Sequence, residues 1–164
     1  GLESAASEWM LNDASGVYHP SWGVTLRWAM PGGYYRQVLD TAAGLDLTKR
    51  EALGFRITQR HDDPLNSDAL IDLHIRLVDR AGTTVSVLLS SARQGALRPN
   101  PLVGAGTKEK SVYETYRISL ESFTDLDSAL RLDSIMSVDW RFDVTATGAV
   151  TIDDVVFSRA GLCE

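Results

Sequence analysis

Alternation of apolar and polar residues with a period of two is the feature that most constrains the fold of this chain. In the segment LIDLHIRLVD, every second position is aliphatic: Ile71, Leu73, Ile75 and Leu77. This period is typical of a half-buried strand in an antiparallel sheet. The next segment, RAGTTVSVLL, has an Ala-Gly turn followed by the same alternation, so the two segments are predicted to form a β-hairpin.

Other segments repeat this pattern, and turn residues separate them. They are GVTLRWA, YYRQVLD, GFRITQRH, VYETYRISL, IMSVDWRFDV and AVTIDDVVF. About eight such strands predict an all-β fold, a two-sheet antiparallel β-sandwich of the jelly-roll type. Only TDLDSALRLDSI and DLTKREAL are expected to form short helical turns. Residues 1–164 are expected to be one sandwich domain, excised from a larger multidomain protein.

The composition excludes several classes of protein. With 44% hydrophobic and 23% charged residues, the chain resembles a globular domain, and its apolar runs are too short to span a membrane. The formal net charge is −6, and Lys and Arg are scattered rather than gathered in the basic stripe that binds nucleic acid. Cys163 is the only cysteine, so no internal disulfide bond can form. Neither nucleic acid nor a membrane is expected as a partner, and a monomer is expected.

Two adjacent carboxylates, Asp153 and Asp154, lie within a segment that otherwise looks like a buried strand, TIDDVVFS. Strict alternation directs Asp153 outward and Asp154 inward, so a β-bulge or an edge position must relieve the second carboxylate.

Four segments, in the order LESAASEW, LDLTKREALGFRI, LDSIMSVDWRFD and GAVTIDDVVFS, resemble the galactose-binding-like jelly roll of carbohydrate-binding modules attached to secreted glycoside hydrolases. The last segment, with Gly and an apolar residue shortly before IDDV, is the most specific of them.

This resemblance implies a non-catalytic module of a secreted, bacterial protein. Such a module binds an oligo- or polysaccharide and brings a covalently linked catalytic or surface domain to it. The resemblance also implies a structural Ca²⁺ between the first and last strands, with Glu3 and either Asp153 or Asp154 as ligands. Carboxylate oxygens are suitable ligands for calcium. The alternative is that both aspartates are ordinary charged residues at a strand edge.

Aromatic residues are the first group of candidates for saccharide binding, because a flat ring can cover the apolar face of a pyranose. The candidates lie in or beside predicted loops: Trp9, Trp22, Tyr34 and Tyr35. Trp28 and Trp140 are instead in phase with inward aliphatic residues, so they are predicted to lie in the core.

The second group lies on the polar side of the central strands, where Arg, Asp and His alternate with aliphatic residues. The binding candidates from this group are Arg60, His74, Arg76 and Arg141. They form one polar face only if their strands are neighbours in one sheet. The alternative is a solvated outer face with cross-strand ion pairs.

Two other functions stay open. A structural or protein-interaction β-sandwich module of a secreted protein would show an apolar patch without convergent polar groups. A β-sandwich polysaccharide lyase would use His74, Arg76 and a tyrosine in a deep cleft. No motif fixes a serine or a cysteine beside any of the 3 histidines, so no enzymatic activity is predicted.

Overall fold

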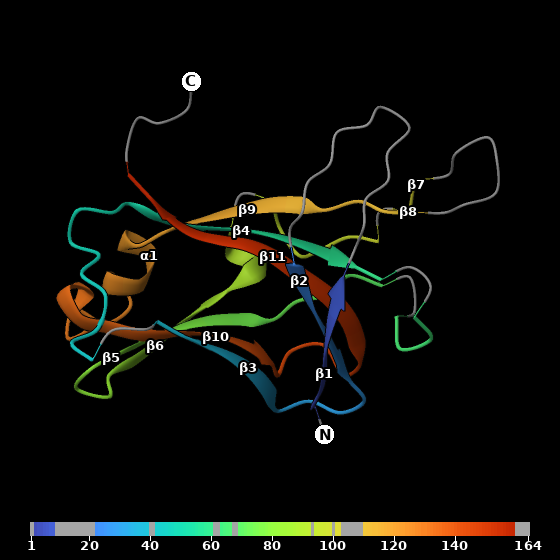
Figure 1. Cartoon of the computed structure of the whole chain (residues 1–164), viewed down its shortest axis with the longest axis horizontal. Coiled ribbons are helices and arrows are strands. Elements are labelled where there is room, and N and C mark those ends of the chain that lie inside the picture. Colours follow the sequence, from blue (N-terminus) through green and yellow to red (C-terminus); the bar gives the residue numbers. More distant parts are fainter. Residues whose placement is uncertain are drawn as a thin grey trace.

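The computed structural model describes residues 2–8, 22–39, 42–60, 63–66, 69–92, 94–99, 101–102 and 110–159. In this part of the chain, regular structure is almost entirely β, and two antiparallel sheets face each other as layers (Figure 1). The predicted two-sheet β-sandwich is therefore confirmed. No helix among these residues is long and apolar enough to cross a membrane.

Sheet A, the upper layer in Figure 1, has five described strands in the order β1-β2-β11-β4-β9. These strands are β1 (Leu2–Glu8), β2 (Trp22–Trp28), β11 (Gly148–Ser158), β4 (Ala52–Gln59) and β9 (Glu114–Ser119). Each strand runs antiparallel to its neighbours. The long strand β11 pairs with β2 on one side and with β4 on the other, so the end of the chain forms the middle of this sheet.

Sheet B, the lower layer, has four described strands in the order β3-β10-β5-β6. These strands are β3 (Gly33–Val38), β10 (Ile135–Phe142), β5 (His74–Asp79) and β6 (Thr84–Leu88). Strands β5 and β6 are antiparallel neighbours and form the predicted hairpin. Strand β3 lies at the edge of the sheet, beside β10.

The remaining elements are short. They are β7 (Pro101–Leu102), β8 (Lys110–Ser111), helix α1 (Glu121–Thr124) and the 3-10 helices η1 (Leu89–Ser91) and η2 (Leu132–Ser134). Helix η2 lies in the segment TDLDSALRLDSI, as predicted. The segment DLTKREAL contains a short turn, in which the Arg50 N–H donates to the Leu47 carbonyl at 2.9 Å, and then enters β4.

The inward side chains of both sheets form one hydrophobic core. Trp28 of β2 stacks on Phe142 of β10 with ring centroids 4.3 Å apart, and Trp140 of β10 meets Phe55 of β4 edge-on at 6.1 Å. Both tryptophans are buried, which confirms their predicted place in the core. The rings of Trp28 and Trp140 thus join the two layers.

The prediction that the first and last strands lie side by side is wrong, because β2 lies between β1 and β11. The antiparallel pairing of β1 with β2 places Glu3 opposite Arg27, and Arg27 is opposite Ala149 of β11. Glu3 is therefore level with Ala149, whereas Asp153 lies further along β11. The two predicted calcium ligands are not neighbours in the sheet.

The condition for one polar face shared by all the central strands, that they are neighbours in one sheet, is not met. The chain crosses from sheet A to sheet B between β4 and β5, so the outer sides of these strands face opposite directions. Arg60, which follows β4, is separated in this way from His74 and Arg76 of β5 and from Arg141 of β10.

Candidate functional site

The outer face of sheet B collects polar and aromatic side chains from three neighbouring strands. The strand register places Arg36, Asp139 and Arg76 in one row across β3, β10 and β5. The adjacent row consists of Tyr34, Arg141 and His74, and Asp143 directly follows β10 on the same side. We call these seven residues the polar face: Tyr34, Arg36, His74, Arg76, Asp139, Arg141 and Asp143.

Asp139 is the centre of the polar face, and its side chain is 0% exposed. Nε and Nη2 of Arg36 donate to its two carboxylate oxygens at 2.8 and 2.9 Å. Arg76 donates through Nε at 2.9 Å and also through Nη2. Burial by itself would raise the pKa of Asp139, but the hydrogen bonds and charges of the two guanidinium groups outweigh it and hold this pKa below its usual value. Asp139 therefore carries a negative charge that two cations share.

Tyr34 lies over these two cations. The guanidinium carbons of Arg36 and Arg76 are 5.4 and 5.6 Å from the centroid of the Tyr34 ring. Cation–π attraction at these distances orients the ring. Tyr34 is nevertheless 49% exposed, so much of its surface is available to a ligand.

The second row of the polar face offers hydrogen-bonding groups that are partly open to solvent. Nδ1 of His74 lies 2.8 Å from Oδ1 of Asp143, and Nε of Arg141 lies 3.2 Å from Oδ2 of the same carboxylate. The side chains of His74 and Arg141 are both 35% exposed. A surface with one ordered aromatic ring beside several fixed donors and acceptors suits a ligand that has an apolar face and many hydroxyl groups.

The structure brings together four of the residues that the sequence nominated for binding: Tyr34, His74, Arg76 and Arg141. Tyr35, nominated with its neighbour, points instead between the sheets, with its ring centroid 5.8 Å from that of Trp140. This orientation follows from the alternation of side chains along β3, which sends adjacent residues to opposite sides, so Tyr35 is not part of the polar face. Trp9 and the side chain of Trp22 lie outside the described residues.

Sequence reasoning did not nominate Arg36, which makes two hydrogen bonds to Asp139. The available signal was its position two residues after Tyr34 in an alternating segment, because this spacing places both side chains on the same side of a strand.

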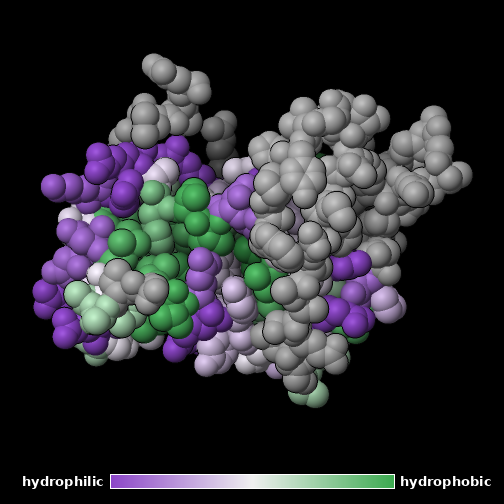
Figure 2. Space-filling model, viewed as in Figure 1, coloured by the Kyte–Doolittle hydropathy of each residue, from purple (hydrophilic) through white to green (hydrophobic). Residues whose placement is uncertain are grey.

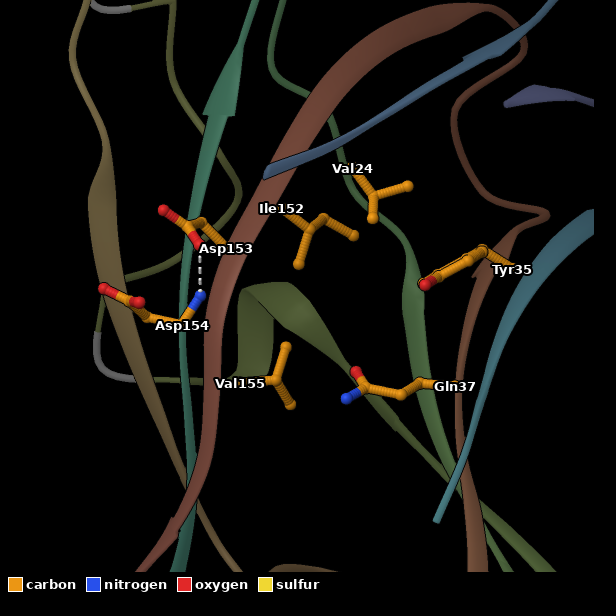
Figure 3. Close-up of a pocket in the computed structure, with 7 residues that line it drawn as sticks. All are labelled: Val24, Tyr35, Gln37, Ile152, Asp153, Asp154 and Val155. Carbon is orange, nitrogen blue, oxygen red and sulfur yellow. Dashed lines mark hydrogen bonds between the residues drawn. The ribbon is translucent and has the colours of Figure 1, made fainter. Parts of the chain in front are cut away.

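Asp153 and Asp154 lie in sheet A, at a β-bulge in the pairing of β11 with β4. Of the two alternatives that the sequence left open, a bulge or an edge position, the structure has the bulge. Asp153 is buried at 7% exposure and accepts the backbone N–H of Asp154 at 2.8 Å, whereas the side chain of Asp154 is 52% exposed (Figure 3). The backbone of Asp154 has a φ of 50°, which is uncommon for a residue other than glycine.

Arg56 of β4 is a cationic partner of both aspartates. Its Nη2 donates to Asp153 at 3.1 Å, and its Nε lies 2.8 Å from a carboxylate oxygen of Asp154. The ring of Tyr113 lies beside the guanidinium group, with its centroid 5.3 Å from the guanidinium carbon. Burial, together with the charge of Asp153, raises the pKa of Tyr113 to about 12, so this phenol stays protonated at neutral pH.

These contacts do not fit the implied calcium site. A guanidinium group occupies the position beside Asp153 and Asp154 that a cation would take, and Glu3 is not beside them in the sheet. In the described part of the chain, no three His, Cys, Asp or Glu residues are grouped so that they could hold a metal ion. Calcium stays a prediction from the resemblance.

Several solved structures with the same architecture are carbohydrate-binding modules. One is a family 30 module of a cellulosomal cellulase of Clostridium thermocellum, with a TM-score of 0.61, 13% identity and coverage of 96% of this chain and 90% of that chain. This chain therefore shares the β-sandwich fold of that module. A family 11 module from the same organism, solved with a β-1,3-1,4-mixed-linked tetrasaccharide, has a TM-score of 0.58 and 14% identity over 98% of this chain and 85% of that one.

The same module fold also occurs within a longer chain, that of an exo-β-agarase. That match has a TM-score of 0.58 and 15% identity, and it covers 98% of this chain but 23% of the agarase chain. The sequence matches no protein-family model and no curated protein.

Proposed function

We propose that this chain is a non-catalytic carbohydrate-binding module and that the polar face of sheet B binds an oligo- or polysaccharide. The observation that carries the proposal is the exposed ring of Tyr34, which is held over Arg36 and Arg76 and flanked by Arg141 and His74. An aromatic ring covers the C–H face of a pyranose, while the surrounding side chains exchange hydrogen bonds with its hydroxyl groups.

The arrangement of the polar face lowers the cost of binding. The ion pairs of Asp139 hold Arg36 and Arg76, and these two side chains in turn orient the Tyr34 ring. Side chains that are ordered before the ligand arrives lose less conformational entropy when it binds. A polysaccharide thus meets a preformed surface built on strands.

Two features of the similar structures support the wider proposal. The family 11 module was solved with a bound tetrasaccharide, and the agarase carries the fold as a minor part of a longer chain. We therefore propose that this module belongs to a secreted, bacterial protein, where it would hold a covalently linked catalytic or surface domain close to its polysaccharide. Tethering of this kind raises the effective concentration of the attached domain without new chemistry.

A glycan array followed by calorimetric titration of the best ligand tests the proposal. Tyr34→Ala and Arg141→Ala should each weaken binding about tenfold or more, a change of roughly 1.4 kcal/mol. Arg117→Ala is the matched control, because Arg117 is a similarly exposed arginine in sheet A. An array without any bound glycan would contradict the proposal, as would equal losses in Arg117→Ala and Arg141→Ala.

The lyase alternative is tested with the same ligands. His74 and Arg76 are both on the polar face, but His74 is paired with Asp143 and Arg76 with Asp139. Incubation of the module with the bound glycans should release no product with an unsaturated terminal sugar. Release of such a product, and its loss in a His74→Ala variant, would overturn the non-catalytic assignment.

A further inference from the structure

A hollow of about 210 Å³ lies between the two sheets, at the edge where β3 faces β2 and β11 (Figure 3). We call it the edge crevice, and its lining residues are Val24, Tyr35, Gln37, Ile152, Asp153, Asp154 and Val155. In the surface view, hydrophobic residues (green) are exposed between the hydrophilic surfaces of the two layers (Figure 2). Val24, Tyr35 and Val155, which line the crevice, are partly buried and pack against the hydrophobic core.

The sheet A wall of the edge crevice is aliphatic. Val24, Ile152 and Val155 supply its side chains, whereas the carboxylates of Asp153 and Asp154 point to the other side of β11 (Figure 3). The bulge produces this arrangement. The bulge adds one residue to β11, and as a result Val155 faces the crevice. The next residue, Val156, lies opposite Gly54 on the outer side of the sheet, where its side chain is 54% exposed.

The β3 wall of the crevice carries polar groups. The side chains of Tyr35 and Gln37 extend from β3 across the hollow toward β11 (Figure 3). Both occupy inward positions of the strand, where an aliphatic residue would ordinarily fill the core. Gln37 is the clearest anomaly, because a partly buried amide loses hydrogen bonds to water.

The hydrogen-bonding groups on this wall have no partner among the residues that the structure describes. Within the described part of the chain, neither the Tyr35 hydroxyl nor the Gln37 amide makes a side-chain hydrogen bond. Partly buried polar groups are normally satisfied by protein or by ordered water, so a site lined by two such groups is prepared for a polar partner. On the opposite wall, Asp154 keeps its unusual backbone conformation, which costs roughly 1–3 kcal/mol and often accompanies a functional site.

We propose that the edge crevice is a second saccharide site, which takes one neutral sugar ring. The apolar face of the ring would lie on Val24 and Val155, and its hydroxyl groups would exchange hydrogen bonds with the Tyr35 hydroxyl and the Gln37 amide. The volume is below the roughly 300–1,000 Å³ of typical ligand pockets, which fits a single ring rather than an extended chain. The site is separate from the polar face, since Tyr34 and Tyr35 point to opposite sides of β3.

Amide NMR spectra recorded during titration with methyl β-glucopyranoside and methyl β-galactopyranoside test this site. We expect at least one glycoside to shift the amide signals of Val24, Gln37 and Val155 with an affinity in the millimolar range. Gln37→Leu removes the amide, and Tyr35→Phe removes the hydroxyl while keeping the ring beside Trp140. Each variant should weaken binding in the crevice about fivefold, which corresponds to the loss of one hydrogen bond.

Tyr34→Ala is the matched control, because it alters the polar face and leaves the crevice intact. It should not change the affinity that the crevice signals report. The second site is refuted if neither glycoside shifts the crevice signals of the wild-type module, or if Gln37→Leu and Tyr35→Phe both bind as the wild type does. Binding of longer glycans to the polar face is measured separately, so that failure of one site does not imply failure of the other.

Discussion

The outer faces of the two sheets each contain a buried aspartate, yet the residues around it differ. On sheet B, Asp139 is shared by arginines from both neighbouring strands, Arg36 and Arg76, in a regular ladder. On sheet A the ratio of arginines to aspartates is reversed, because one arginine, Arg56, pairs with both Asp153 and Asp154 at a bulge. The arginines of both sheets have an aromatic ring in cation–π contact, but Tyr34 on sheet B is 49% exposed, whereas Tyr113 on the sheet A side is half-buried. The same residue types therefore give a regular, partly exposed polar surface in one sheet and a local backbone adjustment in the other.

The largest effect that we predict is on stability, for Asp139→Ala. This change leaves two guanidinium groups without their shared carboxylate, and breaking a buried ion pair in this way costs roughly 3–5 kcal/mol. Urea unfolding followed by tryptophan fluorescence measures the free energy of unfolding. Asp153→Ala is the matched variant in sheet A, and it should lose less, because Asp154 remains as a partner of Arg56. Equal losses would show that the two sites are equivalent.

The next effect is on binding, for Tyr34→Ala compared with Tyr113→Phe. Both tyrosines lie beside arginine in cation–π contact, but Tyr34 is on the polar face and Tyr113 is on the sheet A side. Tyr34→Ala should weaken binding of the best array ligand about tenfold or more while changing the free energy of unfolding by less than about 1 kcal/mol. Tyr113→Phe should leave that affinity unchanged. An equal loss of affinity in both variants would place the ligand elsewhere.

A smaller effect is expected in the pH dependence of stability. Because the pKa of Asp139 is lower in the folded state than in the unfolded chain, its ion pairs stabilise the fold fully above the ordinary aspartate pKa of about 3.9. This contribution should disappear as the pH falls through the lower, folded-state pKa. The difference in unfolding free energy between wild type and Asp139→Asn should therefore be constant near pH 7 and shrink below about pH 4. A difference that does not change down to pH 2 would contradict the assignment.

The smallest change that we predict is in the melting temperature when calcium is removed. Since Arg56 is paired with Asp153 and Asp154, a chelator should leave the melting temperature unchanged. A fall of several degrees, restored by added calcium but not by magnesium, would instead support the metal that the sequence resemblance implies.

The sequence predicted those parts of the fold that depend on local patterns. Alternation identified the β5–β6 hairpin and the core positions of Trp28 and Trp140, and the adjacent Asp153 and Asp154 indicated the bulge. These features could be predicted because they are local. An alternating pattern, or two adjacent aspartates within it, restricts the backbone conformation of the segment in which it occurs.

The choice of sheet for each strand was not predictable in the same way. Nothing in the segment around Arg60 distinguishes a strand of sheet A from one of sheet B, because both alternate identically. The partnership of Asp139 with Arg36 depends on residues that are distant in sequence, since it exists only when β3 pairs with β10 in the observed register. Long-range pairing of this kind is decided by the packing of the whole sandwich rather than by any one segment.

The turn that precedes β3 has a consequence for how such a module diversifies. Gly32, with a φ of 103°, is hydrogen-bonded to the carbonyl of Phe142 at the start of this strand and anchors the turn to β10. Insertion or deletion of one residue there would exchange Tyr34 and Tyr35 between the surface and the interior. Under the proposed function, a point substitution at one of these tyrosines would change one surface of the strand, whereas a change in turn length would alter both surfaces at once.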